Sequence, residues 1–184
     1  MKHAILVHGF QGKPMAGWRP WMRRELEARG WKVSVPAMPT PDKPRLEEWV
    51  AVIEKEVGKG GNGCFLIGHS LGCIAILRYL EVCKEDVAGT LLVAGFVEKL
   101  GDGFEAIDNF VSAPLDAKKV AAACPKIFAI FSDNDPYVPL SQERVMRERL
   151  GANTKILHAR GHFSSSEGTT ELPEALDALL GMAH

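Results

Sequence analysis

Three side-chain types that can cooperate in nucleophilic catalysis stand in three separate segments of this sequence. Ser70 lies in "GHSLG", two carboxylates lie in "SDNDPYVP" (132–139), and His162 lies in "RGHF". A serine hydroxyl is a weak nucleophile unless a base takes its proton, and the base is commonly oriented by a third group. The order Ser, Asp, His along the chain therefore indicates a nucleophile, an orienting acid and a general base.

Ser70 occupies the centre of the pattern Gly-x-Ser-x-Gly at 68–72. The apolar run 64–68 predicts a strand before it, and the apolar run 71–83 predicts a largely buried helix after it. In this setting the pattern is typical of a nucleophile elbow, whose glycines permit a sharp turn with an exposed hydroxyl. The alternative is a plain strand-to-helix turn in which the serine caps the helix. We favour the nucleophile because its partners are also present.

His162 is the best candidate for the base, because it lies in a glycine-flanked loop just after a predicted strand. The sequence contains six histidines. His69 adjoins the serine but is wrongly aimed to take its proton, and His8 belongs to a turn with Gly9. His3 and His158 lie in or at the ends of predicted strands, where we expect the rings to be packed in the sheet, and His184 is the terminal residue.

Two aspartates compete for the role of orienting acid. Asp133 follows closely on a predicted strand, where its side chain could bond nearby backbone in an Asx-type turn. Asp135 precedes Pro136, which favours an extended conformation and leaves the carboxylate freer to reach the next loop. The chain order alone does not separate Asp133 from Asp135.

Backbone N–H groups aimed at the developing oxyanion would complete such a site. One donor is expected to be the N–H of Leu71, the residue after the nucleophile. The second is expected from the loop after the first strand, in "VHGFQG" (7–12), where Phe10 is the prediction and Gln11 a possible substitute.

Short apolar segments alternate with helical patterns along the whole chain. The predicted strands are 3–8, 32–37, 64–68, 90–94, 126–131 and 154–159. Helical signals between them include Pro20 with Gly30, an apolar stripe at 46–57, a cap at Asp116, a cap at Ser141 and a start at Pro173. We therefore predict a compact α/β fold, with a mostly parallel sheet of about six strands and helices on both faces.

The segment 95–115 follows the fourth predicted strand, and it is too short to form a large lid. We expect it to build one wall of the pocket through Phe96, Phe104 or Phe110. The four tryptophans, including Trp18 and Trp49, are expected in the core.

Length, composition and charge narrow the class of protein. The chain has 184 residues, of which 46% are hydrophobic and 24% charged, with a formal net charge of −1. We expect a single domain over 1–184, and the near-neutral charge argues against nucleic-acid and membrane partners. No apolar run is long enough for a membrane span, and no secretory signal is recognised.

The cysteines give no sign of a disulfide framework or a metal site. Cys64, Cys73, Cys83 and Cys124 are scattered through predicted strands and helices, with no Cys-x-x-Cys pattern. Free thiols in a chain of this size are typical of a reducing compartment, which predicts a cytoplasmic protein. No metal site is therefore expected among the cysteines.

Taken with these motifs, the chain resembles the α/β-hydrolase superfamily, and in particular the small serine hydrolases grouped with the retinoblastoma-binding hydrolase. The resemblance rests on "HGF" (8–10), "GHSLG" (68–72), "SDNDPYVP" (132–139) and "GHF" (161–163). It implies a fold that lacks the first two antiparallel strands, and a triad of Ser70, Asp135 and His162 with no metal and no organic cofactor. The retinoblastoma-pocket motif L-x-C-x-E is absent, since "LEVCKE" (80–85) has one residue too many.

The sequence thus predicts a serine hydrolase that cleaves carboxylic esters, thioesters or small amides in a small-molecule acyl substrate. The alternative is a binding or interaction protein on the same fold, in which the three residues are not catalytic. A lyase that uses the same residues is a third, less favoured interpretation.

Overall fold

Six short strands form one sheet in the computed structural model, which describes residues 1–184. Their order in the sheet is β2-β1-β3-β4-β5-β6, and every neighbouring pair is parallel. This confirms the predicted α/β fold with a six-stranded sheet. The strands are β1 (His3–Val7), β2 (Lys32–Ser34), β3 (Cys64–His69), β4 (Gly89–Val93), β5 (Ile127–Ser132) and β6 (Asn153–Leu157).

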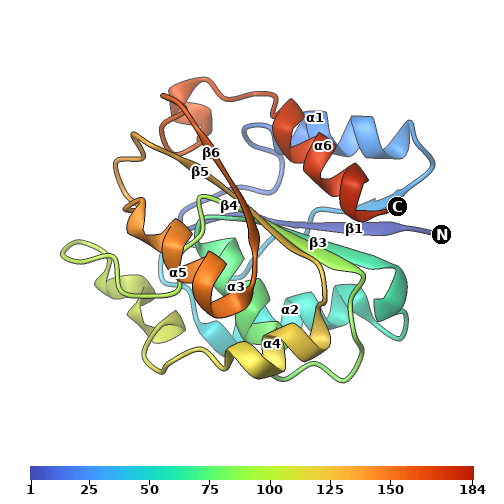
Figure 1. Ribbon diagram of the computed structural model, residues 1–184, viewed down its shortest axis with the longest axis horizontal. Coiled ribbons are helices and arrows are strands. Elements are labelled where there is room, and N and C mark those ends of the chain that lie inside the picture. The colour runs from blue at the N-terminus through green and yellow to red at the C-terminus, as the bar shows by residue number, and fades with distance from the viewer.

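Helices cover both faces of the sheet (Figure 1). Helices α1 and α6 lie on one face, and α2, α3, α4 and α5 lie on the other. No helix combines the length and the apolar character that crossing a bilayer requires. The helices are α1 (Arg19–Glu27), α2 (Leu46–Val57), α3 (Leu71–Leu80), α4 (Ala117–Ala123), α5 (Ser141–Leu150) and α6 (Pro173–Met182), with short 3-10 helices η1 (Gly61–Gly63), η2 (Glu105–Phe110) and η3 (Ser165–Glu167).

Two hydrophobic clusters fill the space between the sheet and its helical layers. In β1, Ile5 and Val7 belong to the cluster under α2–α5, whereas Ala4 and Leu6 belong to the cluster under α1 and α6. This alternation follows from the two-residue period of a strand, and it requires apolar residues at every position of a strand covered on both faces. Strands β1, β3 and β4 are buried at every position, so the loops that carry the candidate site start from the core of the sheet.

Some predicted boundaries differ from the observed ones. Strand β2 ends at Ser34 rather than at residue 37, and α3 ends at Leu80 rather than at residue 83. The prediction that Ser141 caps α5 is wrong, because Leu140 holds the cap position and makes no side-chain cap bond. The cap at Asp116 is confirmed, because its carboxylate accepts the Lys119 N–H at 3.2 Å.

The connection after β4 folds back onto the body of the protein and contains η2. Phe96 and Phe110, two of the residues expected to line a pocket, are instead fully buried in the cluster under α2–α5. Phe104 does line the cavity described below. The connection therefore supplies one wall of that cavity, while most of its aromatic surface stabilises the core.

Candidate active site

Ser70 stands at the junction of β3 and α3 in a conformation that few non-glycine residues adopt. Its φ is 53° and its ψ is −119°, and its N–H donates to the Val93 carbonyl at 2.9 Å. A side chain at Gly68 would place its Cβ 2.8 Å from the Cα of Cys73, and one at Gly72 would collide with the Val7 carbonyl. Both glycines are therefore needed for the backbone to pass so closely, and the sharp turn predicted at 68–72 is present.

The structure places His162 against Asp135 and not against Asp133. The Nδ1 atom of His162 is 2.8 Å from Oδ2 of Asp135, and both side chains are largely buried. The other carboxylate oxygen of Asp135 accepts the N–H groups of Tyr137 and Val138. The Asx-type turn expected at Asp133 is therefore formed by Asp135, and its bonds fix the carboxylate that faces the histidine.

Asp133 supports the next loop instead. Its carboxylate accepts the Ala159 N–H at 2.8 Å and contacts His158 Nδ1 at 2.6 Å. The Ala159 hydrogen bond, followed by that from His158, lowers the pKa of the Asp133 carboxyl. The expectation that His158 is packed in the sheet is wrong, because its side chain is 90% exposed.

Two further side chains hold the backbone of His162. The Glu167 carboxylate accepts the His162 N–H at 2.9 Å, and the Nε2 group of His69 donates to the His162 carbonyl at 2.8 Å. Gly161, with φ of +54°, leaves the room that the Glu167 carboxylate occupies. Burial tends to raise the pKa of Glu167, but hydrogen bonds from His162 and Ser164 outweigh it and lower the pKa.

His69 does not contact the serine as a base. Because its Nε2 donates to a carbonyl, that nitrogen carries the proton, and burial holds the pKa of His69 well below its usual value. The neutral ring also packs edge-on against Trp18. His69 is therefore a neutral support for the His162 loop, in agreement with the expectation that it is wrongly aimed.

Ser70 and His162 line the same cavity but form no hydrogen bond to each other in this structure. Hydrogen bonds between catalytic groups are often long in enzymes without substrate. Since Nδ1 of His162 is engaged by Asp135, Nε2 is the ring nitrogen that can turn to the cavity and to Ser70.

In the loop after β1, the carbonyl of Gly9 is held by hydrogen bonds and the N–H of the same peptide unit, that of Phe10, has no partner. The Gly9 carbonyl accepts both the Gly12 N–H at 3.1 Å and the Nδ1 group of His8 at 2.9 Å. In a trans peptide the C=O and N–H groups point in opposite directions, so fixing the Gly9 carbonyl also fixes the Phe10 N–H. The Phe10 N–H makes no hydrogen bond, whereas the Gln11 N–H donates to the Pro41 carbonyl.

His8 itself is held between two segments. Besides its bond to Gly9, its Nε2 accepts the Met38 N–H at 3.2 Å, and its ring packs edge-on against Trp49. Burial lowers the pKa of His8, which keeps the ring neutral and able both to donate and to accept. Leu71, the other predicted donor residue, is the first residue of α3, where N–H groups have no partner within the helix.

The cavity around Ser70 has a volume of about 680 Å³ and is lined by two groups of side chains. The first group, called here the apolar side, comprises Leu100, Phe104, Ile107 and Tyr137, of which Phe104 and Tyr137 pack edge-on against each other. The second group, called here the polar side, comes from the loop before α1 and the turn after His162, which approach each other at Gly17 and Ser165. Its members are Gln11, Lys13, Arg19 and Ser164–Ser166, and Ala16 and Phe163 of the same segments also line the cavity.

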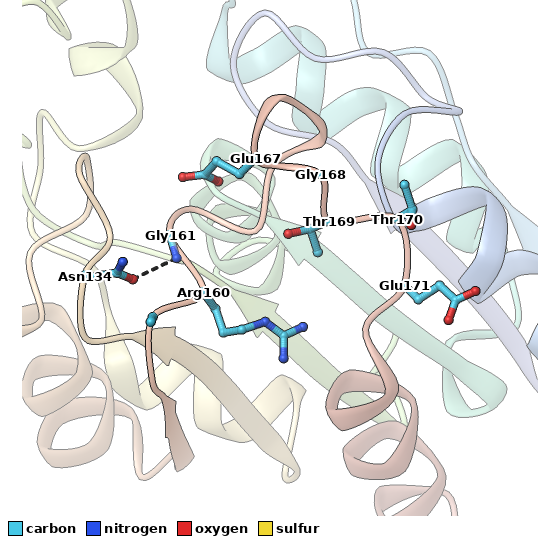
Figure 2. A pocket seen from close by; sticks show the side chains of 9 residues that line it. Asn134, Arg160, Gly161, Glu167, Gly168, Thr169, Thr170 and Glu171 are labelled. Atoms are coloured by element: carbon cyan, nitrogen blue, oxygen red, sulfur yellow. Dashed lines mark hydrogen bonds between the residues drawn. The ribbon is translucent and has the colours of Figure 1, made fainter.

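A second cavity of about 530 Å³ lies beside the His162 loop (Figure 2). Asn134 borders it and accepts the Gly161 N–H at 2.8 Å, the bond drawn as a dashed line. Asn134 also accepts the Ser132 hydroxyl. This cavity therefore exposes the back of the loop and not the reacting groups. The structure has no cluster of three or more His, Cys, Asp or Glu side chains placed to hold a metal ion.

Three supporting residues were not predicted from the sequence: Glu167, His69 and His8. A signal for Glu167 was present, because Ser164 and Glu167 form the Ser-x-x-Glu capping box that the structure confirms. No comparable pattern marked the two histidines, since their partners lie in distant segments. Their contacts depend on the tertiary structure.

Comparison with known proteins agrees with this architecture. The model of a family described as Serine hydrolase matches residues 4–180. YdeN of Bacillus subtilis (strain 168) is 31% identical over 180 residues, which cover 97% of this chain and 94% of YdeN. Serine hydrolase RBBP9 of Rattus norvegicus is 33% identical over 167 residues, which cover 89% of this chain and 88% of that protein. The crystal structure of the B. subtilis ydeN gene product superposes with a TM-score of 0.94, over 100% of this chain and 99% of that chain.

Proposed function

This chain belongs to the serine hydrolase family, and from that premise we propose that Ser70, His162 and Asp135 form a catalytic triad. The proposed reaction is cleavage of carboxylic esters, thioesters or small amides through an acyl-serine intermediate. One observation carries this proposal. His162 is bound through Nδ1 to the buried Asp135 carboxylate and shares a cavity with Ser70, which is held in an elbow.

In the proposed mechanism, Ser70 Oγ attacks the acyl carbon while His162 Nε2 takes the hydroxyl proton. The bond to the leaving group then breaks, and His162 returns that proton to the departing oxygen, sulfur or nitrogen. Water next attacks the acyl carbon with His162 again as base, which releases the acid and restores Ser70. Asp135 keeps the imidazole in the tautomer with its proton on Nδ1 and stabilises the imidazolium.

The N–H groups of Phe10 and Leu71 are the proposed oxyanion donors. Phe10 is supported over Gln11 because the Gln11 N–H is already bonded to Pro41, whereas the Phe10 N–H has no partner. Losing one such donor in other enzymes costs about 2.7–4 kcal/mol of transition-state stabilisation. His8 contributes indirectly, since it holds the carbonyl of the same peptide unit.

The experiment that tests the nucleophile is labelling with a fluorophosphonate, which reacts with an activated serine and not with a helix cap. We expect the wild type to be labelled once per chain at Ser70, and Ser70→Ala to remain unlabelled. Ser166→Ala, which removes an exposed serine of the same cavity, is the matched control and should be labelled fully. Equal labelling of Ser70→Ala and wild type would refute the assignment.

A binding protein on the same fold is the competing proposal. It predicts a folded wild type that is neither labelled nor active on any acyl ester. The bonds that orient Asp135 and His162 argue for catalysis, because a binding site does not require a histidine fixed at its side chain, N–H and carbonyl together.

The apolar side of the cavity favours short or medium acyl groups. Leu100, Phe104 and Ile107 offer an apolar wall, but no separate lid domain covers it. We expect kcat/KM to be higher for acetyl and butyryl nitrophenyl esters than for long-chain ones. A clear preference for long chains would contradict this expectation.

We also propose that the protein acts in the cytoplasm. Its four cysteines are all free, and Cys64, Cys73 and Cys124 are buried. This arrangement supports a reducing compartment.

A further inference from the structure

The charged side chains that line the cavity around Ser70 are all basic. Arg19 and Lys13 line it, whereas no aspartate or glutamate does. Two cations without an acid are notable in a chain whose acidic residues outnumber lysine and arginine by 23 to 22. The charge of this cavity therefore differs from that of the molecule as a whole.

Arg19 is the more informative of the two because it is 5% exposed. Its Nε donates to the Pro14 carbonyl at 3.0 Å and its Nη2 donates to the Lys13 carbonyl at 2.9 Å. Nη1 makes no hydrogen bond, and the guanidinium forms no ion pair. A guanidinium has five N–H donors, so most of its donor capacity is unused.

The other buried arginine of the chain shows what a purely structural role looks like. Arg78 is 8% exposed, forms an ion pair with Glu81 at 2.8 Å, and donates to the carbonyls of Phe110, Ala113 and Pro114. Its charge is neutralised and its donors are engaged. Arg19 has no such acid, and a buried charge without a partner is costly.

The position of Arg19 links it to the reacting groups. Its guanidinium carbon lies 5.9 Å from the ring centre of Trp18, which packs against His69, the residue before Ser70. Burial lowers the pKa of Arg19 to about 10, so the side chain remains charged at neutral pH. The field of this cation also contributes to lowering the pKa values of His69 and His8.

The acidic residue of the turn after His162, Glu167, does not neutralise the charge on the polar side of the cavity. Glu167 lines the second cavity instead, and its carboxylate is engaged by N–H groups of His162 and Ser164. A Cβ at Gly17 would lie 3.7 Å from the Ser165 backbone nitrogen, so the Arg19 loop and this turn are in contact. Ser165 lines the cavity, and its hydroxyl makes no hydrogen bond.

We infer that the polar side of the cavity is an anion subsite centred on Arg19, and that the substrate carries a carboxylate beside its scissile acyl bond. This inference rests on the proposed hydrolase function and names its substrate class. The planar fork of a guanidinium matches a carboxylate in geometry as well as charge. Lys13 and Ser165 would add a mobile cation and a hydroxyl donor, while the apolar side receives the remainder of the substrate.

Matched ester pairs test the inference and locate the anion. Mono-4-nitrophenyl adipate is compared with the neutral 4-nitrophenyl ester of adipic acid monoamide, which places the anion in the acyl part. 4-Acetoxybenzoate is compared with 4-acetoxybenzamide, which places it in the leaving group. In at least one pair, we expect wild-type kcat/KM to favour the anion by about tenfold or more.

Arg19→Gln should remove that preference, lowering kcat/KM for the anionic ester about tenfold while changing that for the neutral ester less than about threefold. Arg19→Lys, which keeps the charge, should retain part of the preference. Arg24→Gln, an exposed change on the same helix, is the control and should alter neither ester. An equal loss on both esters in Arg19→Gln would show a structural role only and overturn the inference, as would a wild type without preference in either pair.

The neutral esters separate this inference from the proposed function. If wild type cleaves them and Ser70→Ala does not, the hydrolase proposal holds whatever the outcome for the anion. If no ester is cleaved, calorimetric titration with adipate and with benzoate shows whether the cavity binds a carboxylate. Binding that is lost in Arg19→Gln but kept in Arg24→Gln supports the subsite, and absence of binding to the wild type overturns it. If Arg19→Gln does not fold, the test rests on wild type and Arg19→Lys. A wild-type preference for the anionic ester that Arg19→Lys retains in part supports the subsite, and a wild type without preference overturns it.

Discussion

The elbow that carries Ser70 and the loop that carries His162 border one cavity, but different interactions hold their backbones. The elbow is fixed by close backbone packing, with Gly68 and Gly72 against neighbouring main chain. The His162 loop is fixed by hydrogen bonds to side chains, those of Glu167 in the turn that follows and of His69 and Asp133 in distant segments. Changes in the elbow should therefore affect folding, whereas changes around the loop should affect activity in a folded protein.

The largest effect is expected where the loop meets the proposed acid. Asp135→Asn should lower kcat by a factor on the order of 10⁴, because the neutral amide no longer selects the productive imidazole tautomer. Asp133→Asn should lower kcat far less, because its partners are His158 and Ala159 and not His162. Steady-state kinetics on both variants, with folding checked by circular dichroism, show which of the two aspartates is the acid. The reverse ranking would make Asp133 the acid.

The substitution Gly72→Ala tests whether close backbone packing at the elbow is needed for stability. Its Cβ would collide with the carbonyls of Val7, the last residue of β1, and of His8, the residue after it. We expect a loss of about 3 kcal/mol or more in the free energy of unfolding in urea, at the upper end of overpacking costs. Gly181→Ala is the control, because nothing lies within 4 Å of its added Cβ. A Gly72→Ala protein as stable as wild type would show that the elbow can relax.

Glu167→Gln should give an intermediate effect on the loop. The substitution weakens the bonds to the N–H groups of His162 and Ser164, and small displacements of a catalytic group can cost up to about 100-fold. We expect kcat to fall about 10- to 100-fold, with little change in the unfolding midpoint. Glu171→Gln, an exposed acid of the same cavity wall, is the control. Unchanged kcat in Glu167→Gln would mean that Asp135 and His69 suffice to place His162.

The smallest effect is a pH dependence of stability that originates at His69. Burial lowers the pKa of His69 in the folded state, so the unfolded chain binds the extra proton first as the pH falls. Its contribution is therefore complete above about pH 6.5 and is lost below it, at no more than about 1.4 kcal/mol per pH unit. The difference in unfolding free energy between wild type and His69→Gln should narrow from pH 7 to pH 5. A constant difference would mean that folding does not change the pKa of His69.

The sequence alone was sufficient for the fold class and for the segments that carry the candidate site. Apolar strands that alternate with amphipathic helices indicate a parallel sheet covered on both faces, because helices on both faces bury the side chains on both faces of such strands. Gly68 reports a local steric requirement, because the atoms that a side chain there would meet belong to Gly72 and Cys73, which are close by in the chain. Those features are local and periodic, and so they can be recognised from residue types and spacing.

Tertiary structure decided the features that depend on contacts between distant segments. Only the three-dimensional arrangement shows that Asp135 faces His162, that Pro41 engages the Gln11 N–H, and that Phe96 and Phe110 are in the core. It also places Arg19, a residue without any sequence signal, in the cavity with no acid beside it. Whether a charge is buried and paired depends on which loops meet at the carboxyl edge of the sheet, and spacing along the chain does not encode that meeting.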